Sequence, residues 1–120
     1  MIKLKKIYKT YKTSKDIVVP ALSEVDISFS STGMVFILGK SGSGKSTLLN
    51  IIGGLDKYDS GEIFIKGKST KNFKQSDFDS YRNTSIGFIF QEYNLLEDLT
   101  VYENIKLAID LQGKKITKII

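Results

Sequence analysis

Two stretches near the N-terminus alternate apolar and polar residues in the manner of β-strands. In residues 24–30, one face carries Val25, Ile27 and Phe29, and the other carries Asp26, Ser28 and Ser30. This alternation predicts an antiparallel strand with one solvated face. Residues 2–11 interleave apolar residues with lysines, so we interpret them as an edge strand whose charges protect it from pairing with other chains. A shorter apolar segment at 62–66, between Gly61 and Gly67, predicts another strand.

Two other stretches are apolar almost without interruption. Residues 34–38 read Met-Val-Phe-Ile-Leu, and residues 85–90 read Ser-Ile-Gly-Phe-Ile-Phe before Gln91. Runs of this kind are typical of central strands in a parallel sheet that is covered on both faces. We therefore expect both runs to form buried strands.

Helical spacing of apolar residues begins at Lys45. The predicted packed face consists of Leu48, Leu49, Ile51, Ile52 and Leu55. The Gly53-Gly54 pair marks the end of this helix. A second, shorter helix is predicted from Ser76 to Arg82, because Asp79 follows Ser76 at the spacing of a helix start.

A third helix is predicted near the end of the chain. Thr100 and Glu103 have the spacing of a capping box, in which each side chain satisfies a backbone N–H group of the other residue. The stripe that follows consists of Val101, Ile105, Ala108, Ile109 and Gln112. Gly113 stops the helix. A new apolar segment begins at Lys114, and because such a segment packs against something, we expect the domain to be incomplete at residue 120.

Gly39–Ser46 reads Gly-Lys-Ser-Gly-Ser-Gly-Lys-Ser and completes the pattern G-x-x-x-x-G-K-[ST] between a predicted strand and a predicted helix. Gly39, Gly42 and Gly44 permit backbone turns that are closed to other residues, so that successive N–H groups can point at an anion. The start of the helix adds its positive dipole end. An accidental match in a chain of this length has a probability of about one per cent or less, so we predict a loop that binds the phosphates of a nucleotide.

The side chains of this loop have distinct expected roles. Lys45 would reach the β- and γ-phosphate oxygens and is the first predicted catalytic residue. The Ser46 hydroxyl would ligate Mg²⁺, and Thr47 would donate a hydrogen bond to the α-phosphate. Ser41 and Ser43 are small enough to leave the phosphates room, and we include them in the predicted site.

Composition narrows the chemistry. The chain has 120 residues, enough for one core. It contains no Cys and no His, which excludes disulfides, thiol chemistry, His-based triads and most transition-metal sites. The net charge of +5 suits a polyphosphate. No apolar run approaches the length of a membrane span, and the lysine-rich start lacks the apolar segment of a signal peptide, so we expect a cytoplasmic protein.

These residues resemble the N-terminal half of an ATP-binding-cassette (ABC) transporter nucleotide-binding domain over nearly all 120 positions. The motifs that carry the resemblance are residues 9–11 as the A-loop, residues 39–47 as Walker A, and residues 87–91 as the strand into the Q-loop. Residues 46–56, 91–96 and 100–104 are similar to the branch that exports macrolides, releases lipoproteins or exports antimicrobial peptides. Lys40 departs mildly from the residue often found at its position.

The resemblance implies roles for two residues outside the loop. Tyr11 would lay its ring on the adenine of ATP; the alternative is an ordinary buried or solvated tyrosine. Gln91 would contact Mg²⁺ or the attacking water through its amide oxygen, which makes it both a predicted catalytic residue and a metal ligand; the alternative is a polar strand end satisfied by backbone. Glu92 is not expected to be the catalytic carboxylate, because no Asp precedes it.

The fold class that the resemblance implies is α/β, with a P-loop NTPase core of parallel strands and helices and an N-terminal antiparallel β subdomain, truncated after the Q-loop region. The antiparallel subdomain would take residues 1–33 and 59–68, and the core would take residues 34–56 and 85–91. Residues 92–120 would start a helical subdomain. The family's signature motif, Walker B Asp, catalytic Glu and switch His lie further downstream and do not occur here.

The implied function is binding of Mg-ATP. A full-length parent would hydrolyse ATP to power export or extrusion through a transmembrane permease, fused or separate, at the inner face of the cell membrane. A second ATP-binding domain is the expected dimer partner, and no nucleic acid is expected.

The sequence lacks the motifs of two other nucleotide-binding functions. A small GTPase would need an N-K-x-D motif, which is absent, and a nucleotide kinase would need a lid of arginines, whereas Arg82 is the only arginine. A non-catalytic ATP-binding fragment or a basic binding module stays open, and salt-dependent DNA binding without any effect of ATP would favour the basic module.

Overall fold

The computed structural model describes residues 1–114 of the chain. It divides into two compact units, which we call the first unit (residues 1–78) and the second unit (residue 79 onward). Nearly all of the segment predicted from Lys114 lies outside the described residues. In the described part of the chain, no helix has both the length and the apolar composition needed to span a membrane.

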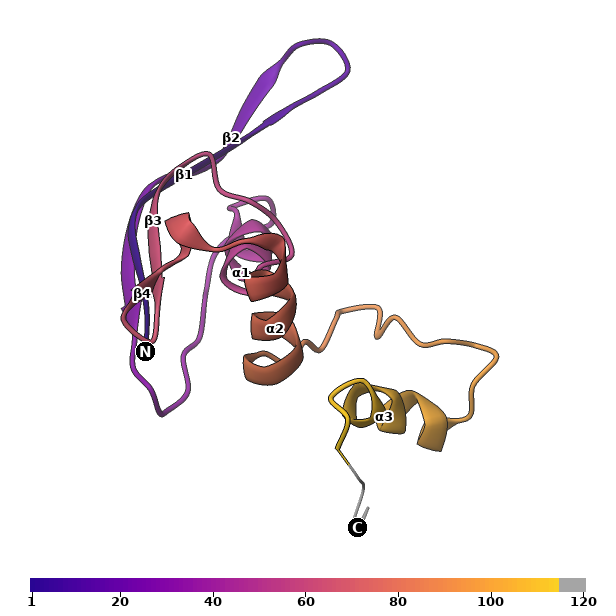
Figure 1. The fold of residues 1–120 in the computed structure, drawn as a ribbon. Helices are drawn as coiled ribbons and strands as arrows, with labels where there is room; N and C mark the ends of the chain where they lie inside the picture. Colours follow the sequence, from indigo (N-terminus) through magenta and orange to yellow (C-terminus); the bar gives the residue numbers. More distant parts are fainter. Residues whose placement is uncertain (115–120) are drawn as a thin grey trace. The chain divides into compact units, whose positions relative to one another are not determined.

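A four-stranded antiparallel sheet in the order β2-β1-β3-β4 dominates the first unit (Figure 1). Its strands are β1 (Ile2–Lys12), β2 (Val18–Phe29), β3 (Ser60–Ile65) and β4 (Lys68–Ser69). The interpretation of residues 2–11 as an edge strand is wrong, because β1 pairs with β2 on one side and with β3 on the other. Alternation shows which side chains of a strand face solvent, but it does not identify the strands beside it.

A bulge in β1 brings the two most deeply buried side chains to the same face. Leu4 and Ile7 are 1% and 0% exposed although they lie three residues apart. The pairing of β1 with β2 shifts between them, and Lys6 takes a left-handed backbone conformation with φ of 47°. An extra residue at this point restores the alternation, so Lys9 and Tyr11 continue the face that Ile7 begins.

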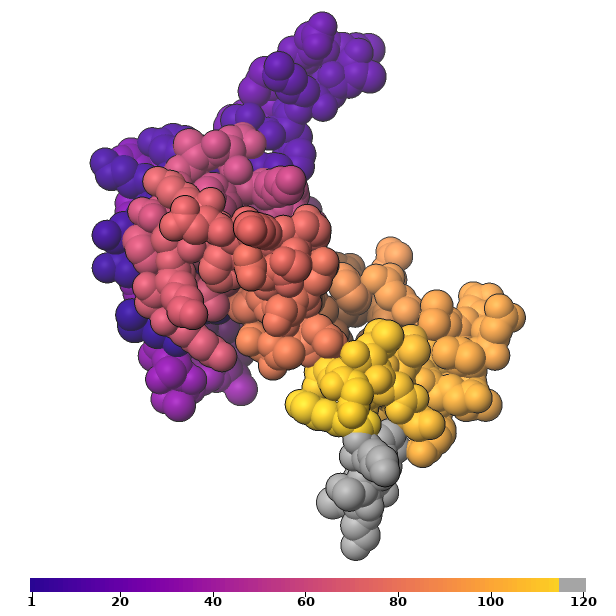
Figure 2. Space-filling view, in the orientation of Figure 1, coloured from indigo at the N-terminus to yellow at the C-terminus, as the bar shows by residue number. Residues whose placement is uncertain are grey.

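The β1–β2 hairpin extends beyond the rest of the sheet. Residues 10–20 are all exposed, and the tip of the hairpin projects from the first unit (Figure 2). Sequence alternation at 24–30 was a correct guide to β2: Val25, Ile27 and Phe29 are half-buried, and the polar residues between them are exposed.

Helix α1 (Lys45–Ile52) begins at the predicted residue and packs its Leu48 and Ile51 side chains into the core. Of the five apolar residues predicted for its packed face, Leu49 and Leu55 are instead about half exposed. The helix ends where the glycine pair predicts, with the Gly53 N–H donating to the Leu49 carbonyl.

The two apolar runs do not form strands. Residues 34–40 and 86–90 have no regular secondary structure, and Phe36, Leu38 and Ile89 are 77%, 89% and 92% exposed. A strand requires a neighbour to which it can hydrogen-bond, and no strand pairs with either run in residues 1–114. The parallel strands predicted for the core are therefore absent from the described part of the chain.

Within residues 1–114, three further helices follow β4. They are η1 (Thr70–Asn72), α2 (Gln75–Ser85) and α3 (Val101–Asp110). Helix α2 is longer than predicted, and the boundary between the two units falls within it. The capping box at the start of α3 is confirmed: the Thr100 N–H donates to Glu103 Oε2 at 2.8 Å, and the Glu103 N–H donates to Thr100 Oγ1 at 3.3 Å.

Candidate nucleotide-binding site

The glycine loop enters α1 through two left-handed residues. Gly42 and Gly44 have φ values of 76° and 90°, a region that residues with a side chain rarely adopt. Gly44 has a second reason to be glycine: a Cβ atom there would lie 2.4 Å from the Ala21 carbonyl oxygen and 3.2 Å from Leu22 Cδ2. The end of the loop therefore packs closely against strand β2.

The Lys45 side chain turns back onto the loop. Its ammonium donates to the carbonyl oxygens of Gly39 and Lys40 at 2.8 and 2.6 Å and lies 3.3 Å from Ser43 Oγ. A lysine ammonium has three donors, so all of them are directed at the loop. The charge predicted to contact the β- and γ-phosphates thus lies at the loop itself. The oxygens of a polyphosphate bound there would accept hydrogen bonds from Lys45 beside the loop carbonyls or in place of them.

The start of α1 is open to an anion. Its N-cap, Gly44, offers no side-chain hydrogen bond, and the first turn contains no acidic residue. The first N–H groups of a helix lack partners within the helix and carry a partial positive charge. Ser46 is exposed and Thr47 half-buried in this turn, so the loop, the lysine and the helix start bring together the groups that an anion site requires.

Magnesium would fit this site only in company with a phosphate ligand. Among residues 1–114, no group of three His, Cys, Asp or Glu side chains could hold a metal ion. Mg²⁺ prefers oxygen ligands and is often held by few protein groups together with substrate phosphates and water. The hydroxyl of Ser46, an exposed residue in the first turn of α1, is an oxygen ligand of the kind that such a shared site needs.

Tyr11 lies in the same unit as the loop but contacts other residues. Its side chain is 40% exposed. Its hydroxyl donates to Asp56 Oδ2 at 2.6 Å, and the ammonium of Lys9 lies 4.8 Å from the centroid of its ring. The proposed contact of Tyr11 with adenine stays a prediction.

Gln91 belongs to the second unit, so its role beside the loop also stays a prediction. It is exposed and begins a turn in which Tyr93 and Asn94 both have left-handed φ values, 59° and 48°. Just before it, the rings of Phe88 and Phe90 stack with centroids 5.4 Å apart.

Sequence reasoning missed the charged residues that contact Tyr11 and its neighbour Thr10, which are Lys9, Asp56 and Asp59. Lys9 is only 8% exposed, and its ammonium lies 3.0 Å from Asp56 Oδ1. Asp59 accepts hydrogen bonds from the backbone and hydroxyl of Thr10. The only signal in the sequence was weak: Lys9 and Tyr11 share a strand face by their spacing, while their partner comes 45 or more residues later.

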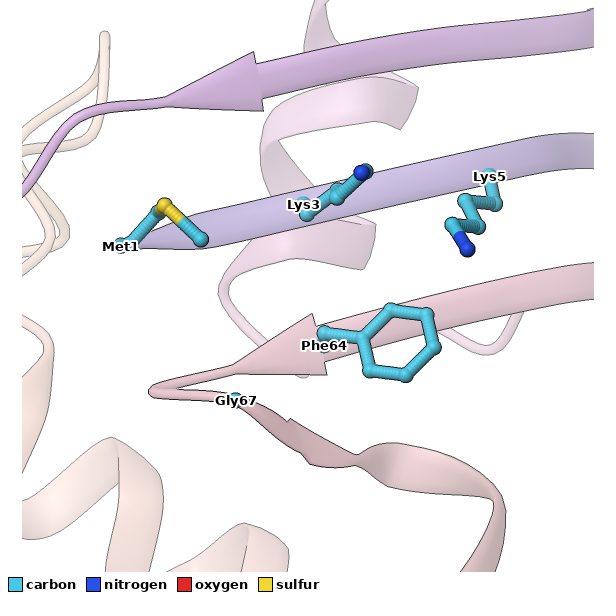
Figure 3. A pocket seen from close by; sticks show the side chains of 5 residues that line it. All are labelled: Met1, Lys3, Lys5, Phe64 and Gly67. Carbon is cyan, nitrogen blue, oxygen red and sulfur yellow. The ribbon is translucent and has the colours of Figure 1, made fainter.

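A cavity of about 220 Å³ lies elsewhere on the first unit, lined by Met1, Lys3, Lys5, Phe64 and Gly67 (Figure 3). Its side chains come mainly from β1 and β3, and the Lys5 ammonium lies 5.3 Å from the centre of the Phe64 ring. No residue of the glycine loop lines it, and its exposed lysines do not converge on a common point in Figure 3. The glycine loop and the start of α1 are therefore the better candidate for a functional site.

Comparison with known proteins identifies the class. The family model for ABC transporters matches residues 22–120. The chain therefore belongs to the ABC transporter family. As the sequence motifs predict, it corresponds to the N-terminal portion of an ATP-binding domain of the branch that includes lipoprotein-release proteins.

Two curated ATP-binding proteins are similar to this chain over most of its length. The chain is 44% identical over 109 residues to an uncharacterized ABC transporter ATP-binding protein, MJ0796, of Methanocaldococcus jannaschii, covering 91% of this chain and 46% of that protein. It is 42% identical over 109 residues to the lipoprotein-releasing system ATP-binding protein LolD of Blochmanniella floridana, covering 91% of this chain and 46% of that protein. The chain thus spans about half the length of the curated relatives it matches.

Solved structures give the same assignment. The dimeric structure of MJ0796, a bacterial ABC transporter cassette, superposes with a TM-score of 0.88 at 40% identity, over 98% of this chain and 50% of the other. A dimeric structure of MJ0796 in a post-hydrolysis state, bound to ADP and Pi, matches with the same TM-score at 39% identity and the same coverage. The backbone described here therefore follows that of an ABC cassette.

Proposed function

We propose that this chain binds Mg-ATP as the nucleotide-binding portion of an ABC transporter. The observation that carries the proposal is the structure of residues 39–47. A left-handed glycine loop leads into a helix start without a side-chain cap, and the Lys45 ammonium is directed at the loop. Backbone N–H groups, a helix dipole and a cation then converge on one place, which is the combination that a polyphosphate requires.

Each loop residue has a part in this proposal. Gly39, Gly42 and Gly44 would let the backbone surround the phosphates, with Ser41 and Ser43 leaving room. Lys45 would exchange loop carbonyls for β- and γ-phosphate oxygens, Ser46 would ligate Mg²⁺, and Thr47 would donate to the α-phosphate. Tyr11 would stack on adenine, and Gln91 would contact Mg²⁺ or the attacking water.

The same proposal accounts for the exposed apolar runs. In a complete ABC domain, residues 34–38 and 85–91 would be strands of a parallel core, beside the antiparallel subdomain of residues 1–33 and 59–68. Residues 92–120 would begin a helical subdomain. The TM-score of 0.88 to an ABC cassette, over 98% of the chain, supports this proposal.

We propose hydrolysis only for the whole protein. Water would attack the γ-phosphorus while the bond from this atom to the β–γ bridging oxygen breaks, yielding ADP and phosphate. Catalysis of phosphoryl transfer depends on in-line positioning and on neutralising charge, and Lys45 would supply part of that charge. The MJ0796 structure with ADP and Pi supports this chemistry.

The partners are proposed on similar grounds. The dimeric MJ0796 cassette supports a second ATP-binding domain as partner. The name of LolD, a lipoprotein-releasing system ATP-binding protein, supports coupling to a membrane permease at the inner face of the cell membrane.

Replacing the loop lysine tests the binding proposal. In the Lys45→Ala variant, we expect the affinity for Mg-ATP, measured by isothermal titration calorimetry, to fall about 10- to 100-fold, as for loss of a hydrogen bond to a charged group. Lys40→Ala is the matched control, because it removes an exposed lysine of the same loop. We expect it to bind nearly as the original chain does. Equal affinity of Lys45→Ala and the original chain would refute the proposed site.

A further inference from the structure

Three side chains form a cluster at the end of β1, outside the glycine loop. The Tyr11 hydroxyl donates to Asp56 Oδ2 at 2.6 Å, and the Lys9 ammonium donates to Asp56 Oδ1 at 3.0 Å. The same ammonium donates to the Lys57 carbonyl at 2.6 Å and lies 4.8 Å from the centroid of the Tyr11 ring. One carboxylate thus joins the phenol and the cation that lies over it.

This cluster restrains the Tyr11 ring at two points. The hydroxyl is held by Asp56, and one ring face is occupied by Lys9. The Lys9 side chain is buried while Tyr11 is 40% exposed, so the ring keeps exposed surface although the cation lies over one of its faces. A ring held in one orientation loses less freedom when a planar ligand stacks on it.

The carboxylate at the centre stays ionised at neutral pH. Burial by itself would raise the pKa of Asp56, but hydrogen bonds from Tyr11 and Lys9, the Lys57 N–H and the charge of Lys9 together hold the pKa below its ordinary value. The ionised form is the better acceptor for both the phenol and the ammonium. The restraint on the ring is therefore present under physiological conditions.

We propose that Lys9 and Asp56 are positioning residues, which hold Tyr11 with one face open to the adenine of a nucleotide whose phosphates lie on the glycine loop. The assignment rests on the proposed function. Helix α1 connects the two places, because the loop precedes its first residue and Asp56 follows its last turn. The helix at whose start the phosphates would bind therefore also fixes the orientation of the Tyr11 ring, through Asp56.

Asp59 provides a matched control within the same turn. Its carboxylate accepts hydrogen bonds from the Thr10 N–H and hydroxyl, at 2.6 and 2.9 Å. Asp59 thus holds the residue next to Tyr11, from the same turn as Asp56 and with a comparable pair of hydrogen bonds, but its bonds go to Thr10 and not to the ring. Replacing it weakens the attachment of β1 to this turn and leaves both restraints on Tyr11 in place.

The test compares a ligand that has a base with one that lacks it. Affinities for Mg-ATP and for Mg-tripolyphosphate are measured for the full chain and for Asp56→Asn, Lys9→Met, Tyr11→Phe and Asp59→Asn, with a thermal melt of each. We expect the first three variants to lose about 3- to 10-fold in Mg-ATP affinity relative to tripolyphosphate, as part of the stacking contribution is lost. Asp59→Asn should keep the original ratio even if it melts earlier.

Each contrary result has its own meaning. If Asp56→Asn and Lys9→Met shift the melting temperature but keep the ratio of the two affinities, the cluster is structural and the positioning role is overturned. Tyr11→Phe removes one exposed hydroxyl only, so it gives the answer even if a charged variant fails to fold. If the original chain binds neither ligand, the proposed function itself fails; if it binds both equally well, only the base-stacking assignment fails.

Discussion

The two units differ in how far apart in sequence their partners lie. In the first unit, β1 pairs with β2 and with β3, and the Lys9–Asp56 pair spans 47 residues. In the second unit, the capping box of α3 spans three residues, and the amide of Asn104 bonds to the backbone of Leu96, Leu99 and Thr100. Long-range contacts specify the first unit, and local contacts specify α3.

Burial follows the same division. Leu4 and Ile7 of β1 are 1% and 0% exposed, whereas Val101, Ile105 and Leu111 of the second unit are 78%, 54% and 70% exposed. Isolated helices shorter than about 12–15 residues are marginal in water, and α3 has ten. A capping box can therefore specify a helix that little apolar burial stabilises.

The largest expected effect comes from removing a core side chain of the first unit. Ile7→Ala should destabilise that unit by about 4 kcal/mol, because a fully buried side chain leaves a cavity. Ile105→Ala, at a half-exposed position, should cost less than about 1 kcal/mol. Amide hydrogen exchange would show whether residues 101–110 keep their protection in Ile7→Ala. Equal loss of protection in both units would mean that they unfold together, and that local contacts alone do not specify α3.

A smaller effect is expected at the glycine that contacts β2. Gly44→Ala should destabilise the first unit by about 2–3 kcal/mol, because a left-handed backbone costs 1–2 kcal/mol for a residue with Cβ and the new atom would meet the Ala21 carbonyl. Gly42→Ala is the control, since no atom lies within 4 Å of its added Cβ. It should cost about 1 kcal/mol. Similar melting temperatures for the two variants would show that β2 does not constrain the loop.

The smallest effect should appear in α3 when the pH falls. Hydrogen bonds from the Thr100 hydroxyl and N–H hold the pKa of Glu103 below its ordinary value. The carboxylate therefore stabilises the helix fully above the unfolded pKa of about 4.3, and this contribution disappears as the pH falls through the lower folded value. NMR amide shifts of residues 101–104 would follow the change. Glu103→Gln, which cannot titrate, should abolish this pH-dependent change. A midpoint above about pH 4.3 would contradict the lowered pKa of Glu103.

Helix ends and caps, which depend on residues close together in the chain, are predicted well from the sequence. The start of α1, its end at Gly53 and the capping box of α3 each depend on residues within a few positions, and all are present in the structure. The glycine loop belongs to this group, and the match of residues 22–120 confirms the family that its motif indicated, the ABC transporter family.

Features that depend on distant partners were predicted poorly. Residues 2–11 were predicted as an edge strand, but β1 lies inside the sheet because β3 pairs with its second side. The runs at 34–38 and 85–90 have the apolar composition of central strands, but composition does not supply a neighbouring strand, and none pairs with them in residues 1–114. The charged cluster around Tyr11 depends on a turn 45 residues away.

The close approach of Gly44 to the Ala21 carbonyl has a consequence for the order of folding. The surface on which the loop rests belongs to β2, which leaves the ribosome before the loop does, whereas β3 emerges afterwards. The β1–β2 hairpin closes through the short turn between Lys12 and Val18, so it can form early, because short loops close at low entropic cost. The support on which the loop rests can therefore form before β3 is available to pair with β1.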